Sequence, residues 1–391
     1  MVSALVPVTA LLIALAPGPE GGLSQVTECV DAGGTGRGGG LPLAGVHALA
    51  DGTGVRVAVI DTGVSPHPRL PRLTGGGDYL TGGDGLTDCD GHGTAVAGLL
   101  AAAPGPDDDV VGVAPGVEVV AIRQASPSFT VTTADGGRRP AGDTASLAGA
   151  VLRAVGLGAS VVTISEAVCL DAARAEVVGR PLRAALQAAR LADVLVVAAA
   201  GNVGSGGCTG APGEVPLPAA AGYPGGPGVL DDGVLAVAAT TADDTPAPFT
   251  VHGPWVDLSA RGTGLRSLAP GAGLTGPDLQ GTSLAVPIVA GAAAVVRQRF
   301  PELDAAGVAE RLVTTARRVP GGRSDALGAG AVDPLAALTA LSSPDPPRPA
   351  PAVVAAGPPS PRTPAWLPVA AVTALCALAA ASPLLARRLR P

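Results

Sequence analysis

The chain has 391 residues, 47% of them hydrophobic, and its net charge is −7. This length accommodates one large α/β domain with additional segments, and with only 2% aromatic residues the core must consist of Val, Ala, Leu and Ile. The acidic and scattered charges exclude a nucleic-acid-binding role, because such proteins present a basic patch.

The first residues are typical of a secretory signal. Met1–Ala16 is an apolar run that ends in small residues, so we assign residues 1–20 as a signal peptide. The run has no basic start and Pro17 follows it, which leaves a buried N-terminal segment as the alternative. Residues 21–50 are expected to form a glycine-rich N-terminal extension with a short helix within Leu41–Ala50.

Strand-like runs of Val and Ala alternate with helix-like segments along residues 51–341. This alternation predicts a three-layer α/β domain, in which helices cover both faces of a mainly parallel sheet. The expected strands are Val55–Ile60, Val117–Ile122, Ser160–Ser165, Asp193–Ala199 and Val234–Ala239, and the expected helices are Gly93–Ala103, Thr144–Leu157, Arg180–Leu191, Ser283–Arg299 and Asp304–Thr315. Two long Gly/Pro-rich segments, Ser126–Asp143 and Gly204–Asp232, are predicted to be functional or partly disordered loops.

The C-terminal part is predicted to anchor the chain in a membrane. Residues 342–364 are rich in proline, which favours an extended linker. Ala365–Ala386 is almost entirely apolar and has the length of a transmembrane helix. Arginines follow directly in the tail at residues 387–391, which places this tail in the cytoplasm. We therefore expect a single-pass cell-membrane protein whose folded domain lies on the extracytoplasmic side and whose C-terminal helix contacts the lipid bilayer.

Four of the five cysteines lie in the part expected to be exported, where an even number suggests two disulfides. Cys169 and Cys208 each follow a strand, and these strands are expected to be neighbours in the parallel sheet. Their loops would then share one edge, which favours Cys169–Cys208 among the three possible pairings and leaves Cys29–Cys89. Cys376 lies in the expected membrane helix and is predicted to be unpaired. The sequence contains no Cys-x-x-Cys pair or histidine cluster that would indicate a metal site.

Three polar residues occur in glycine-flanked frames, in the order Asp61, His92 and Ser283. The frames are the strings VAVIDTGV, DGHGTAVAG and QGTSLAVPIVAG. Taken singly, they have ordinary alternatives: a turn-forming Asp, a structural His, and a Ser that caps a helix. Together they provide the three groups of a Ser-His-Asp catalytic triad, in the chain order of the subtilisin arrangement.

Asn202 is the only asparagine of the chain, and it follows the expected strand Asp193–Ala199. Its side-chain amide and the backbone N–H of Ser283 are predicted to form an oxyanion hole for a tetrahedral intermediate. An asparagine in a left-handed turn is the ordinary alternative.

With these frames the chain resembles the subtilases, and its longer strings resemble the mycosins, membrane-anchored proteases associated with type VII secretion systems. The strings lie within Ala50–Leu341 and are HPRL, GDGLTDCDGHGTAVAGLLAA, VGVAPGVEVVAIRQ, GPWVDLSA and VDPLAALTAL. The resemblance implies a subtilisin-like fold and an endopeptidase that cleaves secreted proteins or peptides without a cofactor. It also implies a type VII secretion membrane complex as the partner. The alternative is a mainly structural subunit of that complex, for which the two long loops would be docking surfaces.

By the same resemblance, Ser165, Glu166 and Ala167 line the substrate cleft. Glu166 occupies a position where an apolar residue is more usual, so we hypothesise that it favours basic or polar substrate side chains. A carboxylate that faces solvent is the alternative. The resemblance further implies that the N-terminal extension wraps around the catalytic domain.

Overall fold

The computed structural model describes residues 22–30, 38–133, 135–221, 233–318 and 321–341. The predicted signal peptide, linker, transmembrane helix and cytoplasmic tail, together with Cys376, lie outside these ranges. No helix within the described ranges is both long and apolar enough to cross a membrane.

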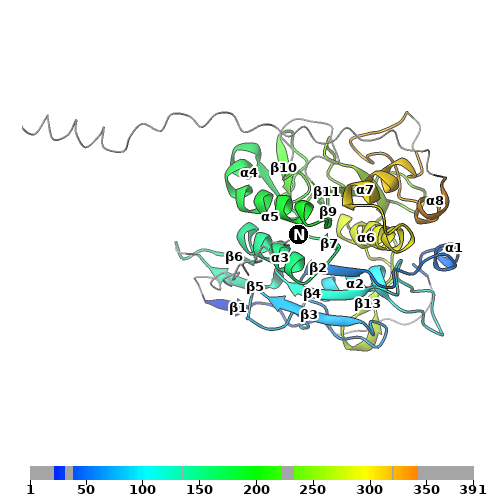
Figure 1. Cartoon of the computed structure of the whole chain (residues 1–391). Helices are drawn as coiled ribbons and strands as arrows, with labels where there is room; N and C mark the ends of the chain where they lie inside the picture. Colours follow the sequence, from blue (N-terminus) through cyan, green and yellow to red (C-terminus); the bar gives the residue numbers. More distant parts are fainter. Residues whose placement is uncertain (1–21, 31–37, 134, 222–232, 319–320, 342–391) are drawn as a thin grey trace, which may run out of the picture. The chain divides into compact units, whose positions relative to one another are not determined.

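A seven-stranded sheet forms the central layer, and all of its paired strands are parallel (Figure 1). The strand order is β12-β11-β9-β7-β2-β4-β3. The bounds are β2 Arg56–Asp61, β3 Leu73–Asp78, β4 Glu118–Arg123, β7 Val161–Ile164, β9 Leu195–Ala199, β11 Val234–Thr240 and β12 Leu258–Arg261. The five predicted strands form the interior of this sheet. The two edge strands, β3 and β12, escaped prediction because their sequences, LTGGGD and LSAR, lack the valine-rich runs of the interior strands.

Side chains of β2 alternate between two hydrophobic cores, one on each face of the sheet. Val57 and Val59 belong to the first core, whereas Ala58 and Ile60 belong to the second. The first core is covered by α1 Ala44–His47, α2 His92–Ala101, α6 Thr282–Arg299, α7 Ala305–Thr314 and α8 Pro334–Thr339, and the second by α3 Thr144–Gly156, α4 Ala172–Val178 and α5 Arg180–Leu191. This arrangement confirms the predicted three-layer α/β fold.

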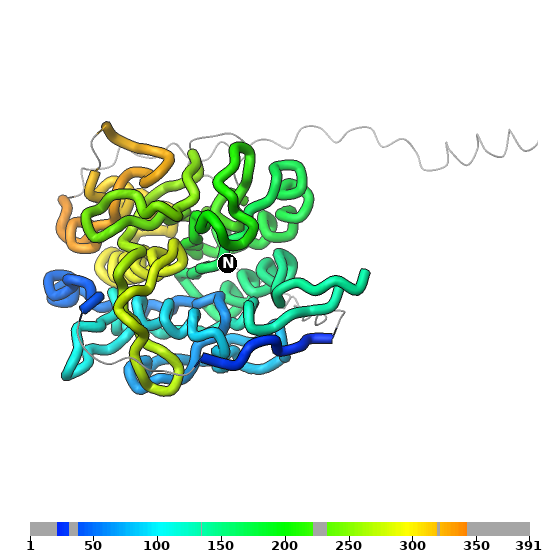
Figure 2. The backbone as a smooth tube through the Cα atoms, turned by 180° about the vertical axis from the view of Figure 1, so that it is seen from behind, coloured from blue at the N-terminus to red at the C-terminus, as the bar shows by residue number. Residues whose placement is uncertain are grey.

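The two segments predicted as loops both contain strands, which occupy most of Ser126–Asp143 but only four residues of the described part of the second segment, Gly204–Asp232. In the first segment, β5 Ser126–Thr132 and β6 Arg138–Ala141 pair as an antiparallel hairpin, and β1 Leu23–Gln25 of the N-terminal extension pairs with β5 (Figure 2). In the second segment, β10 Glu214–Leu217 pairs with β8 Val168–Asp171. β1 and β10 pair with strands distant in sequence, and the β5–β6 hairpin lies in a Gly/Pro-containing segment, so the local pattern did not reveal these short strands. A small two-stranded sheet is formed by β13 Leu268–Ala269 and β14 Gly273–Leu274, on either side of the 3-10 helix Pro270–Ala272.

Both predicted disulfides are confirmed. Cys169–Cys208 joins the β8 strand to the segment after β9, and β7 and β9 are neighbours in the sheet as expected. Cys29–Cys89 fastens the N-terminal extension to the segment just before α2. The extension therefore lies against the domain at two places, through β1 and through this disulfide.

Candidate active site

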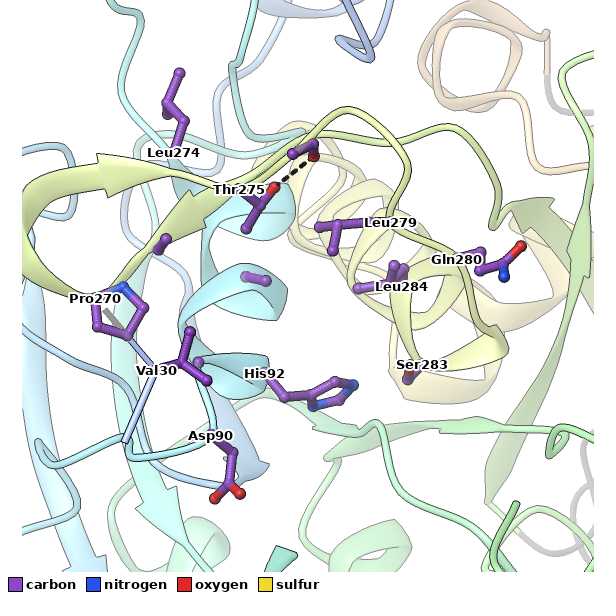
Figure 3. Close-up of a pocket in the computed structure, with 14 residues that line it drawn as sticks. Val30, Asp90, His92, Pro270, Leu274, Thr275, Leu279, Gln280, Ser283 and Leu284 are labelled. Atoms are coloured by element: carbon purple, nitrogen blue, oxygen red, sulfur yellow. Dashed lines mark hydrogen bonds between the residues drawn. The ribbon is translucent and has the colours of Figure 1, made fainter. Parts of the chain in front are cut away.

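Asp61 and His92 are held together by rigid elements. Asp61 ends the buried strand β2, and His92 is the first residue of α2. The fully buried carboxylate accepts hydrogen bonds from Nδ1 of His92 at 2.6 Å and from the N–H of Thr62 at 2.8 Å. Because a carboxylate only accepts, Nδ1 carries a proton, and in the neutral imidazole Nε2 is the ring nitrogen that can accept one. Figure 3 shows the imidazole directed toward the first turn of α6, where Ser283 lies.

Close contact between the segment after β2 and the start of α2 requires glycine. A Cβ at Gly93 would lie 1.9 Å from the carbonyl oxygen of Gly63 and 3.1 Å from Cβ of Asp61. Thr62 bridges the two segments: its hydroxyl accepts from the N–H of Gly93 at 3.0 Å and donates to Asp88 at 2.8 Å. The glycine frame of His92 thus permits the approach that brings the acid and the imidazole together.

Asp88 is a buried residue of the site that sequence reasoning missed. Its carboxylate accepts hydrogen bonds from the N–H groups of Gly91 and Thr94, from the Thr94 hydroxyl and from Thr62. Burial raises the pKa of Asp88, although these hydrogen bonds oppose the shift. The carboxylate thus satisfies free N–H groups at the start of α2 and anchors the turn that carries His92. An acidic residue just before a predicted helix start was the available signal.

Ser283 and Asn202 meet at the start of α6. The side-chain oxygen of Asn202 accepts from the N–H and the hydroxyl of Thr282 at 2.9 and 3.0 Å. A Cβ at Gly281, where φ is 151°, would lie 2.8 Å from Oγ of Ser283 and 3.5 Å from Nδ2 of Asn202. The hydroxyl and the amide nitrogen therefore border the same small space, which glycine leaves open.

Ser165, Glu166 and Ala167 directly follow β7 and line a cleft of about 640 Å³. His92, Ser283 and Asn202 line the same cleft, so the predicted site residues converge. In the described part of the chain, no hydrogen bond joins His92 to Ser283. The described lining residues include the carboxylates of Asp90 and Glu166 but no arginine.

The carboxylates set the proton affinities in this cleft. Burial opposes the imidazolium charge of His92, but the hydrogen-bonded Asp61 outweighs it and, with Glu166 and Asp88, raises the pKa of His92 to about 9. Burial also raises the pKa of Glu166 to about 7, and the negative charge of Asp61 contributes to this shift. Glu166 therefore changes its charge near neutral pH, close to the imidazole.

Among the described residues, no group of three or more His, Cys, Asp or Glu side chains is placed to bind a metal ion. The acidic residues near His92 have other partners. Asp88 accepts from groups of α2, and Asp90 accepts from the Ser126 hydroxyl and the Ser128 N–H. The arrangement in the described ranges is that of an acid, an imidazole, a hydroxyl and an amide donor, which matches acyl-transfer chemistry.

Comparison with known proteins identifies the family. A profile of the subtilase family matches residues 52–330. Mycosin-4 of Mycobacterium tuberculosis is 43% identical over 312 residues, which cover 76% of this chain and 68% of the relative. A solved structure of the MycP3 protease from the type VII (ESX-3) secretion system is 39% identical, with a TM-score of 0.69 and coverage of 84% of this chain and 97% of that one. A chain of the periplasmic assembly from the ESX-5 inner membrane complex is 36% identical, with a TM-score of 0.71 and coverage of 89% and 96%. The chain therefore belongs to the subtilase family of serine endopeptidases and, within it, to the mycosins.

Proposed function

We propose that this mycosin is the membrane-anchored endopeptidase of a type VII secretion system and cleaves secreted proteins or peptides with Asp61, His92 and Ser283. The observation that carries the proposal is the convergence of the Asp61–His92 pair, the Ser283 hydroxyl and the Asn202 amide on one cleft. The similarity of this chain to the ESX-3 protease and to a chain of the ESX-5 inner membrane complex supports the assignment to a type VII secretion system.

In the proposed mechanism, Oγ of Ser283 attacks the scissile carbonyl while Nε2 of His92 accepts its proton. Asp61 holds the imidazole in the required tautomer and stabilises the imidazolium. Nδ2 of Asn202 and the N–H of Ser283 donate hydrogen bonds to the oxyanion. His92 then returns the proton to the leaving amine, and water hydrolyses the acyl-enzyme by the same steps.

The proposed topology places the peptidase domain, residues 51–341, on the extracytoplasmic side. The signal peptide at 1–20 would direct export, and residues 365–386 would anchor the chain through the linker 342–364, leaving residues 387–391 in the cytoplasm. Two disulfides support an oxidising compartment for the domain. The secretion membrane complex and the lipid bilayer are the proposed partners.

Ser165, Glu166 and Ala167 are proposed to bind the substrate. The Glu166 carboxylate, in a cleft whose described lining has no arginine, supports a preference for cationic substrate side chains. A Glu166 carboxylate that faces only solvent would have no such influence, but Glu166 is half-buried in the cleft that His92 also lines, which argues against this alternative.

Labelling with a fluorophosphonate tests the proposal, because this probe modifies only a serine activated by its neighbours. The full chain in membranes should be labelled, whereas Ser283→Ala and His92→Ala should not. A wild type that stays unlabelled would contradict the assembled active site. Secretion assays with Ser283→Ala and with a deletion of the β5–β6 hairpin separate catalysis from a structural role. Full secretion with Ser283→Ala, together with loss of secretion on the deletion, would favour the structural alternative.

A further inference from the structure

A second cavity, of about 490 Å³, also adjoins the proposed catalytic residues (Figure 3). The cleft of about 640 Å³ described above is called the Glu166 cleft here. Among their described lining residues, this cavity and the Glu166 cleft share Asp90, His92 and Ser283 and no others. The two spaces therefore meet at the reacting serine. Consider a peptide whose scissile bond lies at Ser283. If the residues on one side of that bond occupy the Glu166 cleft, the residues on its other side extend into the second cavity.

Apolar side chains dominate the wall of the second cavity. These residues come from the N-terminal extension, α2, the β13–β14 segment, the loop that follows it and α6, and they are Val30, Ala95, Ala269, Pro270, Leu274, Leu279 and Leu284. Among the described lining residues, the one carboxylate belongs to Asp90. It is engaged by the Ser126 hydroxyl and the Ser128 N–H, and Figure 3 shows it directed away from Pro270 and Leu274. The cavity thus contrasts with the acidic cleft on the other side of Ser283.

Val30 brings the N-terminal extension into this wall. The disulfide Cys29–Cys89 precedes it, and its N–H donates to the carbonyl oxygen of Cys89 at 2.8 Å. Two independent links therefore hold Val30 next to the segment that leads into His92. Yet 51% of Val30 is exposed to solvent. An apolar side chain fixed at the rim of a catalytic cavity loses this exposure when another apolar group binds there.

We propose that this cavity binds an apolar side chain of the substrate on the leaving-group side of the scissile bond, and that Val30 contributes to this specificity. The proposal rests on the proposed function, and it takes the cleft at Ser165–Ala167 as the side that binds the acyl part of the peptide. The substrate class is then a peptide with a cationic residue before the scissile bond and an apolar residue at the first or second position after it.

A peptide library tests this specificity, with the full chain in detergent micelles and cleavage sites identified by mass spectrometry. We expect kcat/KM to be roughly tenfold or more higher for peptides with Leu, Ile, Met or Phe after the scissile bond than for peptides with Asp or Ser there. This is the effect of burying one large apolar side chain. Val30→Asp should reduce this ratio by roughly fivefold or more and favour Arg or Lys at that position. Val30→Ala should reduce the ratio less, because it removes apolar area without adding a charge.

Val26→Asp is the matched control, since Val26 lies in the same extension, is 46% exposed and does not line the cavity. This variant should keep the wild-type profile. A wild-type profile with no preference after the scissile bond would overturn the inference, as would equal profiles for Val30→Asp and Val26→Asp. Fluorophosphonate labelling of the same samples separates the two proposals: labelled enzyme with a flat profile contradicts only the apolar subsite, whereas absence of both labelling and cleavage contradicts the proposed function.

Discussion

The side-chain oxygen of Asn202 accepts two hydrogen bonds from Thr282, the residue that directly precedes Ser283. This contact fixes the rotation of the amide, so its nitrogen faces the space beside Oγ of Ser283. The proposed oxyanion donor is therefore oriented by the same turn of α6 that carries the proposed nucleophile.

Removing this donor should lower turnover with little change in KM, because the hydrogen bond forms in the transition state. We expect Asn202→Ala to reduce kcat by ~10²–10³, the range for loss of the corresponding donor in subtilisin. Thr282→Val removes one of the two orienting hydrogen bonds and should reduce kcat by a smaller factor. Steady-state kinetics check both, with Thr282→Ser as the control that keeps the hydroxyl. Equal kcat for wild type and Asn202→Ala would contradict the assigned role.

The raised pKa of His92 predicts an alkaline pH profile. General-base catalysis needs the neutral imidazole, so kcat/KM should rise as the pH increases through about 9. Removing one negative charge makes the imidazolium less favourable, so Glu166→Gln should move the midpoint to lower pH and raise the relative activity near neutrality. The comparison variant is Glu118→Gln, since Glu118 lies at the start of β4, beside Arg56, whereas Asp61 lies at the other end of the neighbouring strand β2. A midpoint that moves equally in both variants would argue against a local effect of Glu166.

Substrate preference should depend on the ionisation of Glu166. Wild type is expected to favour Arg or Lys over Leu before the scissile bond by roughly tenfold or more, and Glu166→Leu should abolish or reverse this ratio. Because the pKa of Glu166 is about 7, the cationic preference should strengthen as the pH rises through that value. Peptide-library profiles at pH 6 and pH 8 measure this change in cationic preference. A profile that is unchanged in Glu166→Leu would refute the hypothesis.

Asp88 should act as a positioning residue. Asp88→Asn keeps the shape, but each carboxylate oxygen accepts one N–H and one hydroxyl, and an amide nitrogen cannot accept either, so one backbone N–H and one hydroxyl lose their acceptor. We expect a loss of unfolding free energy of about 1–3 kcal/mol and a fall in kcat at nearly constant KM. The pH midpoint should also move down, because the charge of Asp88 contributes to the raised pKa of His92. Denaturant unfolding and the pH profile of kcat/KM measure both effects. The control variant is Asp84→Asn, because Asp84 is an exposed residue of the same segment. A purely structural role would leave the pH midpoint in place.

The two disulfides should differ in their effect on catalysis. Each closes a loop of 39 to 60 residues, so replacing either pair by serine should cost roughly 4 kcal/mol of unfolding free energy. A Cβ at Gly201 would lie 3.2 Å from Sγ of Cys208, so loss of Cys169–Cys208 should also lower kcat through Asn202. Loss of Cys29–Cys89 should preserve fluorophosphonate labelling and alter selectivity after the scissile bond. Thermal unfolding and labelling of the two double variants distinguish these outcomes.

Several features follow from the sequence alone because local patterns carry them. Alternating Val/Ala strands and helices predicted the parallel sheet, since both faces of its strands are buried. Strand-end and helix-start frames placed Asp61, His92, Ser283 and Asn202, and the order of strands paired the cysteines. These residues have distinctive neighbours within a few positions along the chain.

Other features depend on contacts between residues far apart in the chain, and the tertiary structure alone decided them. The β5–β6 hairpin lies in a segment that resembles a loop, and β1, about a hundred residues earlier, pairs with it. Asp88 is one acidic residue among many until four donors surround it, and Val30 has no local pattern that points to a cavity. Burial and hydrogen bonding assign these roles, because an isolated carboxylate or valine acquires a function only from the groups that the fold packs against it.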